Sequence, residues 1–259
     1  GRSDAITRSD WRAHAGCETA SFAFDPKHPR FTYATCYLGG IQEFDTETGL
    51  RRNVQEWPAL FFAEPSDAMK YRFNWSAPLA TSPFDPRVIY HGGNVLFVTR
   101  DRGNTWAAIS PDLTRNDPAH HGLASGPFWN DGSGGEVYNT IFYVVESPHE
   151  RGTIWVGTDD GLVQLTRDGG RTWTNVTPPG LAEGLVNAIE VSPHDRATAY
   201  VAFTRTRFGD DAPHLFRTRD YGKTWTDLAG GLPRAYPARV VREDPKRRYM
   251  LYAGTENGV

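Results

Sequence analysis

The octapeptide TRDGGRTW, residues 166–173, occurs three times in this chain in nearly the same form. The other copies are TRDRGNTW at 99–106 and TRDYGKTW at 218–225, so the shared pattern is T-R-D-x-G-x-T-W. Self-similarity along a chain is the sequence signature of a repeat architecture. We therefore align the rest of the sequence relative to the three octapeptides.

The segments ahead of the octapeptides are also similar to one another. Each starts with Ser-Pro, at residues 82, 147 and 192, and continues into a strand-like run with one large aromatic residue. Two weaker copies flank them, FDPKHPRFTYATCYLGGIQEFDTETG from Phe24 and EDPKRRYMLYAGTENGV from Glu243. The aligned aromatic residues lie 57, 65, 45 and 52 residues apart and are Tyr33, Tyr90, Trp155, Tyr200 and Tyr252.

Each repeat is typical of four short antiparallel strands. Its first strand ends at a proline, which cannot donate a hydrogen bond to a neighbouring strand, and the octapeptide joins the third strand to the fourth. Eight Trp, eleven Tyr and fourteen Phe beside 26 Gly and 18 Pro also indicate many strands and tight turns. We predict an all-β fold, a β-propeller of four-stranded blades with four complete blades and half of a fifth.

We expect the whole chain, 1–259, to form one propeller domain. Its repeats cover about 21–75, 76–137, 138–186, 187–237 and, in part, 238–259. Two arrangements stay open. In the first, residues 1–20 supply the outer strands of the fifth blade and close a five-bladed ring. In the second, the blades form an open arc of a larger propeller, and the uncovered sheet face favours a homodimer.

Every residue type in the octapeptide has a structural explanation. The Asp accepts hydrogen bonds from the backbone of its own turn, the Gly supplies a positive φ, and the Trp packs between blades. Because a catalytic group is not normally needed three times, we interpret the octapeptides as scaffold. The residues concerned are Asp101, Gly103, Trp106, Asp168, Gly170, Trp173, Asp220, Gly222 and Trp225.

The octapeptide resembles the Asp-box, or BNR, repeat of bacterial sialidases, xyloglucan-cleaving glycosidases and the sortilin propeller. The sequence around the octapeptides, including SPHDRATAYVA and LYAGTENGV, is similar to that of large bacterial glycosyl-hydrolase-like and sortilin-like BNR proteins. The resemblance implies a propeller with a saccharide or peptide ligand, an extracytoplasmic location, and a chain that is part of a longer one. The sialidase arginine motif F/Y-R-I-P has no match, since its nearest candidate is Arg30 in HPRFT.

Charge and hydropathy argue against two kinds of partner. The net charge is −3, and Lys and Arg form no basic block, so we expect no nucleic-acid and no membrane partner. The first residues, GRSDAITRSDW, lack the apolar run of a signal peptide, and no apolar stretch is long enough for a spanning helix.

Cys17 and Cys36 are compatible with a disulfide or with two buried thiols, and the sequence alone favours the thiols.

The lengths of the connections indicate where function lies. The octapeptide turns are short, whereas the connections at about 56–74, 111–137 and 204–213 are long. In a propeller all three long connections fall on the face opposite the octapeptides. Long loops on one face of a rigid scaffold usually contain the binding and catalytic residues.

The long connections carry side chains suited to sugars, because aromatic rings stack on C–H faces and polar groups bind hydroxyls. The ligand-binding candidates are Tyr71, Arg72, Asn74, Trp75, Trp129, Tyr138 and Arg205. Glycoside hydrolysis needs two carboxyl groups flanking one bond. The catalytic candidates are Glu136 and Asp131 from the long connections and Asp159 from a short turn on the same face. Asp159 with Asp160 also fits a hairpin turn, and Trp75 and Trp129 also fit loop packing.

Two function classes stay open. One is a saccharide-recognising propeller, a glycoside hydrolase if it is catalytic; the other is a protein- or peptide-binding, sortilin-like module without catalysis. A metal-dependent hydrolase using His120 and His121 is less favoured, because these adjacent histidines have no recognisable third ligand. We therefore expect no metal and no cofactor.

Overall fold

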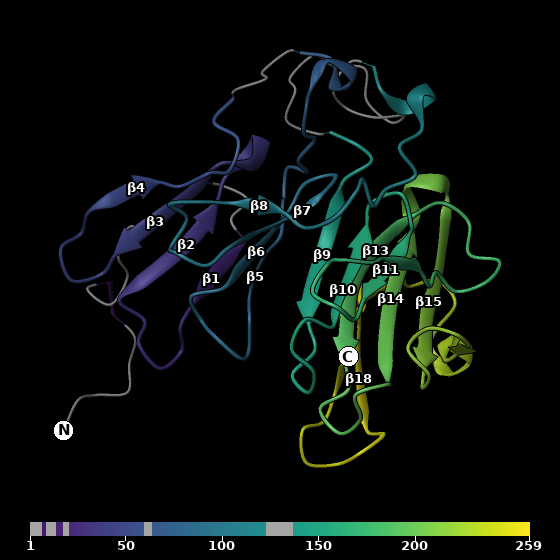
Figure 1. The fold of residues 1–259 in the computed structure, drawn as a ribbon. Coiled ribbons are helices and arrows are strands. Elements are labelled where there is room, and N and C mark those ends of the chain that lie inside the picture. Colours follow the sequence, from purple (N-terminus) through teal and green to yellow (C-terminus); the bar gives the residue numbers. More distant parts are fainter. Residues whose placement is uncertain (1–6, 9–13, 18–20, 60–63, 123–136) are drawn as a thin grey trace.

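The structure is a computed structural model of the chain, and it describes residues 7–8, 14–17, 21–59, 64–122 and 137–259. Within these ranges the strands form four four-stranded antiparallel sheets and one two-stranded sheet. The sheets follow one another in chain order, from blade one to the half blade (Figure 1). This confirms the predicted all-β propeller architecture with four complete blades and half of a fifth.

The blades have the following strands. Blade one contains β1 (Phe22–Phe24), β2 (Phe31–Thr35), β3 (Ile41–Asp45) and β4 (Arg51–Asn53). Blade two contains β5 (Leu79–Thr81), β6 (Ile89–Gly92), β7 (Leu96–Thr99) and β8 (Ala107–Ala108). Blade three contains β9 (Ile141–Glu146), β10 (Ile154–Thr158), β11 (Val163–Thr166) and β12 (Thr174–Asn175). Blade four contains β13 (Leu185–Val191), β14 (Ala199–Arg205), β15 (Asp210–Thr218) and β16 (Thr226–Asp227), and the half blade contains β17 (Ala238–Glu243) and β18 (Leu251–Thr255).

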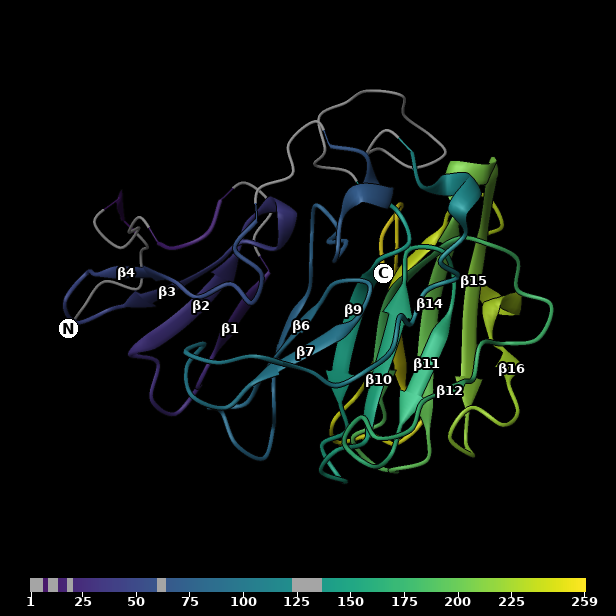
Figure 2. The same ribbon diagram turned by 45° about the horizontal axis from the view of Figure 1, so that its top comes forward.

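Within the described residues, five single-turn 3-10 helices lie in the connections. They are η2 (Tyr37–Gly39), η3 (Ser66–Ala68), η4 (Pro118–His120), η5 (Thr206–Phe208) and η6 (Ala229–Gly231). Figure 2 shows the turn between β14 and β15 at the top, while the β11–β12 and β15–β16 turns lie at the bottom. The first of these belongs to a long connection and the last two are octapeptides. We call the face of the long connections the insertion face.

Each octapeptide closes the turn between the third and fourth strands of its blade. In blade three, Asp168 Oδ1 accepts hydrogen bonds from the Thr172 backbone N–H (2.9 Å) and the Thr166 hydroxyl (2.8 Å), while Oδ2 accepts from the Thr172 hydroxyl (2.6 Å). These bonds lower the pKa of Asp168 to about 2. Gly170 has a φ of 96°, and a Cβ there would lie 2.4 Å from the carbonyl oxygen of Ile109.

The octapeptide tryptophans link neighbouring blades. Trp173 Nε1 donates to the Ile109 carbonyl of the preceding blade at 3.0 Å, and Trp225 does the same to Val176 at 2.8 Å. Between blades three and four, fully buried Trp155 packs with apolar side chains of both sheets. The aligned aromatic residues are thus core residues, except that Tyr252 of the half blade is 43% exposed.

Cys17 and Cys36 form a disulfide, so the expectation of free thiols was wrong. The Cys17 backbone N–H donates to the Thr35 carbonyl at 3.4 Å, and this leaves the two Cα atoms 5.0 Å apart, within the normal range for a disulfide. Sequence spacing alone could not show that the segment containing Cys17 lies against β2.

The described part of the first twenty residues lies on blade one. The His14 ring packs on Phe22 and Phe44, with centroid distances of 4.9 and 4.5 Å, and its Nε2 lies 2.8 Å from the Thr32 hydroxyl. Among the described residues β18 pairs only with β17, which packs on β13 and β14. No described residue therefore supports closure of a five-bladed ring by this segment.

Candidate functional site

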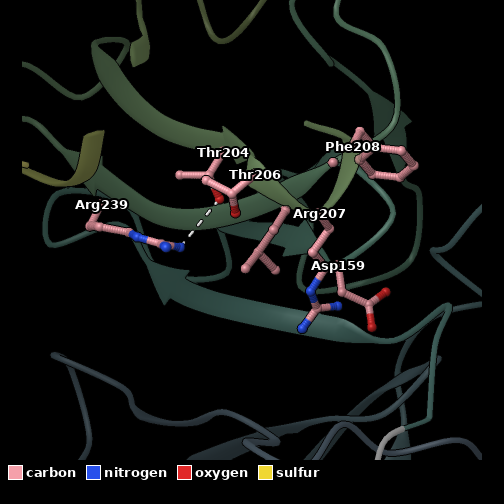
Figure 3. Close-up of a pocket in the computed structure, with 8 residues that line it drawn as sticks. Asp159, Thr204, Thr206, Arg207, Phe208 and Arg239 are labelled. Atoms are coloured by element: carbon pink, nitrogen blue, oxygen red, sulfur yellow. Dashed lines mark hydrogen bonds between the residues drawn. The ribbon is translucent and has the colours of Figure 1, made fainter. Parts of the chain in front are cut away.

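A pocket of about 220 Å³ lies on the insertion face, where blades three and four meet the half blade (Figure 3). Asp159 comes from the β10–β11 turn, Arg239 comes from β17, and the other walls belong to the start of β13 and the end of β14 with η5. The lining residues are Asp159, Gly184, Leu185, Thr204, Thr206, Arg207, Phe208 and Arg239.

Asp159 is the buried carboxyl group of this pocket, with an exposed fraction of 2%. Its Oδ1 accepts from the Thr140 backbone N–H at 2.8 Å, and its Oδ2 accepts from the Thr140 hydroxyl at 2.6 Å and from Asn74 Nδ2 at 3.1 Å. Burial and the adjacent Asp160 raise the pKa of Asp159 to about 7, although the Thr140 bonds and the charge of Arg207 oppose the shift. The carboxyl group of Asp159 therefore keeps its proton to a higher pH than an ordinary aspartate does.

Asp160 has different surroundings, and it does not line the pocket. Its Oδ2 accepts from the Arg115 backbone N–H at 2.8 Å and from Asn139 Nδ2 at 2.7 Å, and its Oδ1 accepts from the Thr158 hydroxyl. Burial also raises the pKa of Asp160. The Asp160 carboxyl group therefore links the β10–β11 turn to the connection between blades two and three.

Arg72 belongs to a buried network behind this site. It is 6% exposed, and its Nη2 donates to Asp112 Oδ2 at 2.6 Å while its Nε donates to the Asn139 carbonyl at 3.3 Å. Burial opposes ionisation of Asp112, but hydrogen bonds from Asn94 and Thr114 and the Arg72 charge outweigh it and lower the pKa. Arg72 thus joins two connections to each other and does not face the pocket.

Glu183 lies close to three polar side chains near the pocket, those of Tyr138, His120 and Arg205. Tyr138 donates its hydroxyl to Glu183 Oε1 at 2.5 Å, and burial together with this bond raises the pKa of Tyr138. His120 Nδ1 lies 3.6 Å from the same oxygen. Arg205 donates from Nε to the Glu183 carbonyl at 2.9 Å and from Nη1 to Asp210 at 3.0 Å.

The aromatic candidates of the first long connection lie elsewhere. Tyr71 packs edge-on against Trp57 and Phe97, with centroid distances of 5.6 and 4.9 Å. Trp75 lies 5.1 Å from the ring of Tyr37, on blade one. Neither residue lines the pocket. The candidates Trp129, Asp131 and Glu136 lie outside the described residues.

Sequence reasoning selected Asp159 and its partner Asn74, and it missed other residues of the pocket region. Arg207 and Phe208 lie in the long connection at 204–213, where nothing in the pattern separated them from Arg205. Arg239 belongs to the partial repeat, and it reaches the pocket only because β17 packs beside blade four. Thr140 and Glu183 carried no recognisable signal.

Two kinds of feature are absent from the part of the chain that the structure describes. No three His, Cys, Asp or Glu side chains in these ranges are placed to hold a metal ion. No helix in the same ranges is long and apolar enough to cross a membrane.

Comparison with known proteins gives relatives that are much longer than this chain. No family model matches. The sequence is 25% identical over 225 residues to the "Probable oligoxyloglucan-reducing end-specific xyloglucanase" of Neosartorya fischeri, and the match covers 79% of this chain and 23% of that protein. The chain thus spans about a quarter of the length of this curated relative.

Two solved structures are similar to the fold. The GH74 enzyme of Niastella koreensis superposes with a TM-score of 0.60 at 19% identity, covering 92% of this chain and 34% of the enzyme. The protein YCF48 bound to a D1 peptide superposes with a TM-score of 0.50 at 15% identity, covering 92% of this chain and 62% of YCF48. At these identities the likeness establishes the propeller fold.

Proposed function

We propose that this chain is an extracytoplasmic Asp-box propeller, one domain over 1–259, that recognises a saccharide and hydrolyses its glycosidic bond. One observation carries the proposal. A buried carboxyl group with a raised pKa, Asp159, lies at the wall of a pocket on the insertion face. The matches to the Neosartorya xyloglucanase and the Niastella GH74 enzyme are consistent with a saccharide ligand.

Asp159 suits the role of a general acid. A general acid works best when its pKa lies near the operating pH, because it then holds a proton and still transfers it readily. The second carboxylate of the reaction would lie about 5 Å away for retention or about 6.5–9.5 Å away for inversion. Glu136 and Asp131 remain the proposed partners, since their connection leads directly into Val137 and Tyr138.

The disulfide supports the proposed location. Disulfides persist in oxidising compartments and are rare in the cytosol, where thiols are kept reduced. Cys17–Cys36 joins the first segment to the end of β2, so it would stabilise blade one outside the cytosol.

The test compares Asp159→Asn with its neighbour Asp160→Asn on a panel of xyloglucan and other plant and bacterial oligosaccharides. We expect Asp159→Asn to lower turnover by about 10²–10⁴-fold, the usual contribution of a general acid, and to leave saccharide binding in place. Asp160→Asn should retain turnover in its folded fraction but lose it at a lower pH, because Asp160 does not line the pocket and its charge helps to raise the pKa of Asp159. Full activity of Asp159→Asn would contradict the assignment.

A second candidate is a protein- or peptide-binding, sortilin-like module. The observation that favours it is the solved structure of YCF48 with its D1 peptide. If no oligosaccharide binds, and a peptide binds in a way that Thr206→Trp in the pocket blocks, this second function replaces the first.

A further inference from the structure

A second cavity, of about 270 Å³, lies on the octapeptide face between blades two and three. Its inner wall includes the buried side chains of Tyr90 and Glu146, each 4% exposed. Three exposed arginines line it further out, Arg100 and Arg171 from two octapeptide turns and Arg151 from the β9–β10 turn. None of these residues lines the insertion-face pocket, so the cavity is a separate candidate site.

At the next two blade junctions along the chain, an acidic residue binds arginine side chains on this face. The acid belongs to the turn that starts with Ser-Pro and joins the first strand of a blade to the second. In blade three it is Glu150, whose Oε1 lies 3.6 Å from Arg167 and 3.5 Å from Arg196 of blade four. In blade four it is Asp195, whose Oδ2 lies 3.0 Å from Arg248 of the half blade.

The equivalent acid of blade two, Asp85, is occupied within its own turn. It accepts from Arg87, from Nε at 3.0 Å and from Nη2 at 2.9 Å. These bonds, and more weakly the charge of Arg151, lower the pKa of Asp85. Arg151 itself donates to the Phe84 carbonyl at 3.4 Å and lies 5.3 Å from the centre of that ring, and no described carboxylate forms an ion pair with it.

The cavity therefore combines unpaired cations with one unsatisfied acceptor. Among the described residues, Arg100 and Arg171 have no ion pair and no side-chain hydrogen bond. Asp168 also lines the cavity, but both its oxygens accept bonds within its own turn. Glu146 Oε1 accepts a backbone N–H of the β9–β10 turn at 2.7 Å. Its Oε2 is buried and has no hydrogen-bond partner of normal geometry in the described part of the chain, although the Tyr90 hydroxyl is near.

We propose that this cavity binds a phosphate group, with its three arginines as the anion-binding groups and Glu146 Oε2 as the acceptor for a phosphate O–H. Guanidinium groups bind phosphate oxygens through charge-assisted, often paired hydrogen bonds. A carboxylate beside them repels an anion without a proton and accepts a hydrogen bond from one that keeps a proton. Phosphate keeps a proton near neutral pH and sulfate does not, so the site should select phosphate.

The experiment is a calorimetric titration of the full chain with sodium phosphate, sodium sulfate and glucose 6-phosphate. It is carried out at about pH 6, near the second pKa of a phosphate monoester, so that a protonated phosphate is present. Phosphate should bind about tenfold or more tightly than sulfate, as expected for a hydrogen bond to a charged group. Tighter binding of the sugar phosphate would identify a monoester as the ligand, and tighter binding of inorganic phosphate would identify the free ion.

Four variants assign the binding groups. Arg100→Gln and Arg171→Gln should each weaken phosphate binding by about tenfold. Glu146→Gln should strengthen sulfate binding and remove the preference, because it removes the negative charge. Arg167→Gln is the matched control: it changes the octapeptide arginine equivalent to Arg100 at the next junction, and phosphate binding should be unchanged. Thermal melting shows whether each variant is folded.

The outcomes are independent of the proposed saccharide function. Thr206→Trp, which fills the insertion-face pocket, should leave phosphate binding intact. Failure of both phosphate compounds to bind, or sulfate binding as tight as phosphate binding, would overturn the inference and leave the saccharide proposal standing. Phosphate binding that survives Arg100→Gln and Arg171→Gln would place the anion elsewhere and contradict the assignment of this cavity.

Discussion

Asp159 and Asp160 are neighbours in sequence with different surroundings in the fold. The sequence TDDG is compatible with a hairpin turn and with a pair of functional carboxyl groups. In the structure Asp160 bonds to its turn and to the neighbouring connection, while Asp159 reaches the pocket wall. The pattern could not separate them, because the difference depends on Thr140 and Asn74, which are distant in sequence.

The raised pKa of Asp159 makes stability depend on pH. Its value in the folded protein, about 7, lies above the ordinary value of 3.8, so the folded protein retains a proton that the unfolded chain releases. The free energy of unfolding should therefore fall as pH rises from about 4 to about 7, by up to about 1.4 kcal/mol per pH unit for one proton. Urea unfolding at pH 5 and pH 7.5 measures the slope.

The Asp159→Asn variant provides the comparison for this slope. An amide does not titrate, so the variant should lose less stability than the native chain between these two pH values. Asp160 contributes a change of the same sign in both proteins, since its pKa is also raised. Equal pH slopes in the two proteins would show that Asp159 is ionised throughout this range.

At the scale of the element, the octapeptide was the most informative part of the sequence. Its Asp, Gly and Trp have the turn bonds, the positive φ and the inter-blade packing expected of those residue types. The bond from the Trp ring to the backbone of the preceding blade was not predicted, because it depends on how adjacent sheets dock. The scaffold role itself remains a prediction for mutagenesis.

Asp168→Ala tests that role. The substitution leaves the Thr172 backbone N–H and two threonine hydroxyls without their acceptor. We expect the free energy of unfolding to fall, with ligand affinity unchanged in the folded protein. Chemical denaturation and calorimetry measure the two quantities. Loss of binding without loss of stability would assign the octapeptide a functional role.

At the scale of the whole molecule, the described blades form a row whose two ends carry exposed aromatic side chains. Phe22 and Phe24 of β1 are 46% and 41% exposed, and Tyr252 of β18 is 43% exposed. Removing residues 1–16 would also uncover the part of Phe22 and Phe44 that His14 covers. We expect this deletion to increase self-association, because an uncovered apolar sheet face favours pairing.

Analytical ultracentrifugation of the full and shortened chains measures this change. His14→Ala is the milder control, because it removes the ring and keeps the rest of the segment. A shortened chain with the sedimentation behaviour and melting temperature of the full chain would show that the segment does not protect blade one.

The fold could be predicted from the sequence because each blade repeats the same local pattern of strands and turns. The pocket could not be, because Asp159, Arg207 and Arg239 belong to three different repeats and meet only after the sheets have packed. Loop length selected one face of the propeller but could not select among the charged residues of that face. Local repetition therefore encodes the scaffold, and unique packing between repeats forms the candidate site.

We propose that a saccharide binds in the insertion-face pocket and not on the octapeptide face. Calorimetric titration of one oligosaccharide into two matched tryptophan variants tests it most directly. Thr206→Trp fills the pocket, while Arg171→Trp places the same side chain in a cavity of about 270 Å³ on the octapeptide face. We predict that Thr206→Trp abolishes binding and that Arg171→Trp binds as the native chain does. Binding that persists in Thr206→Trp and disappears in Arg171→Trp would place the saccharide site on the octapeptide face.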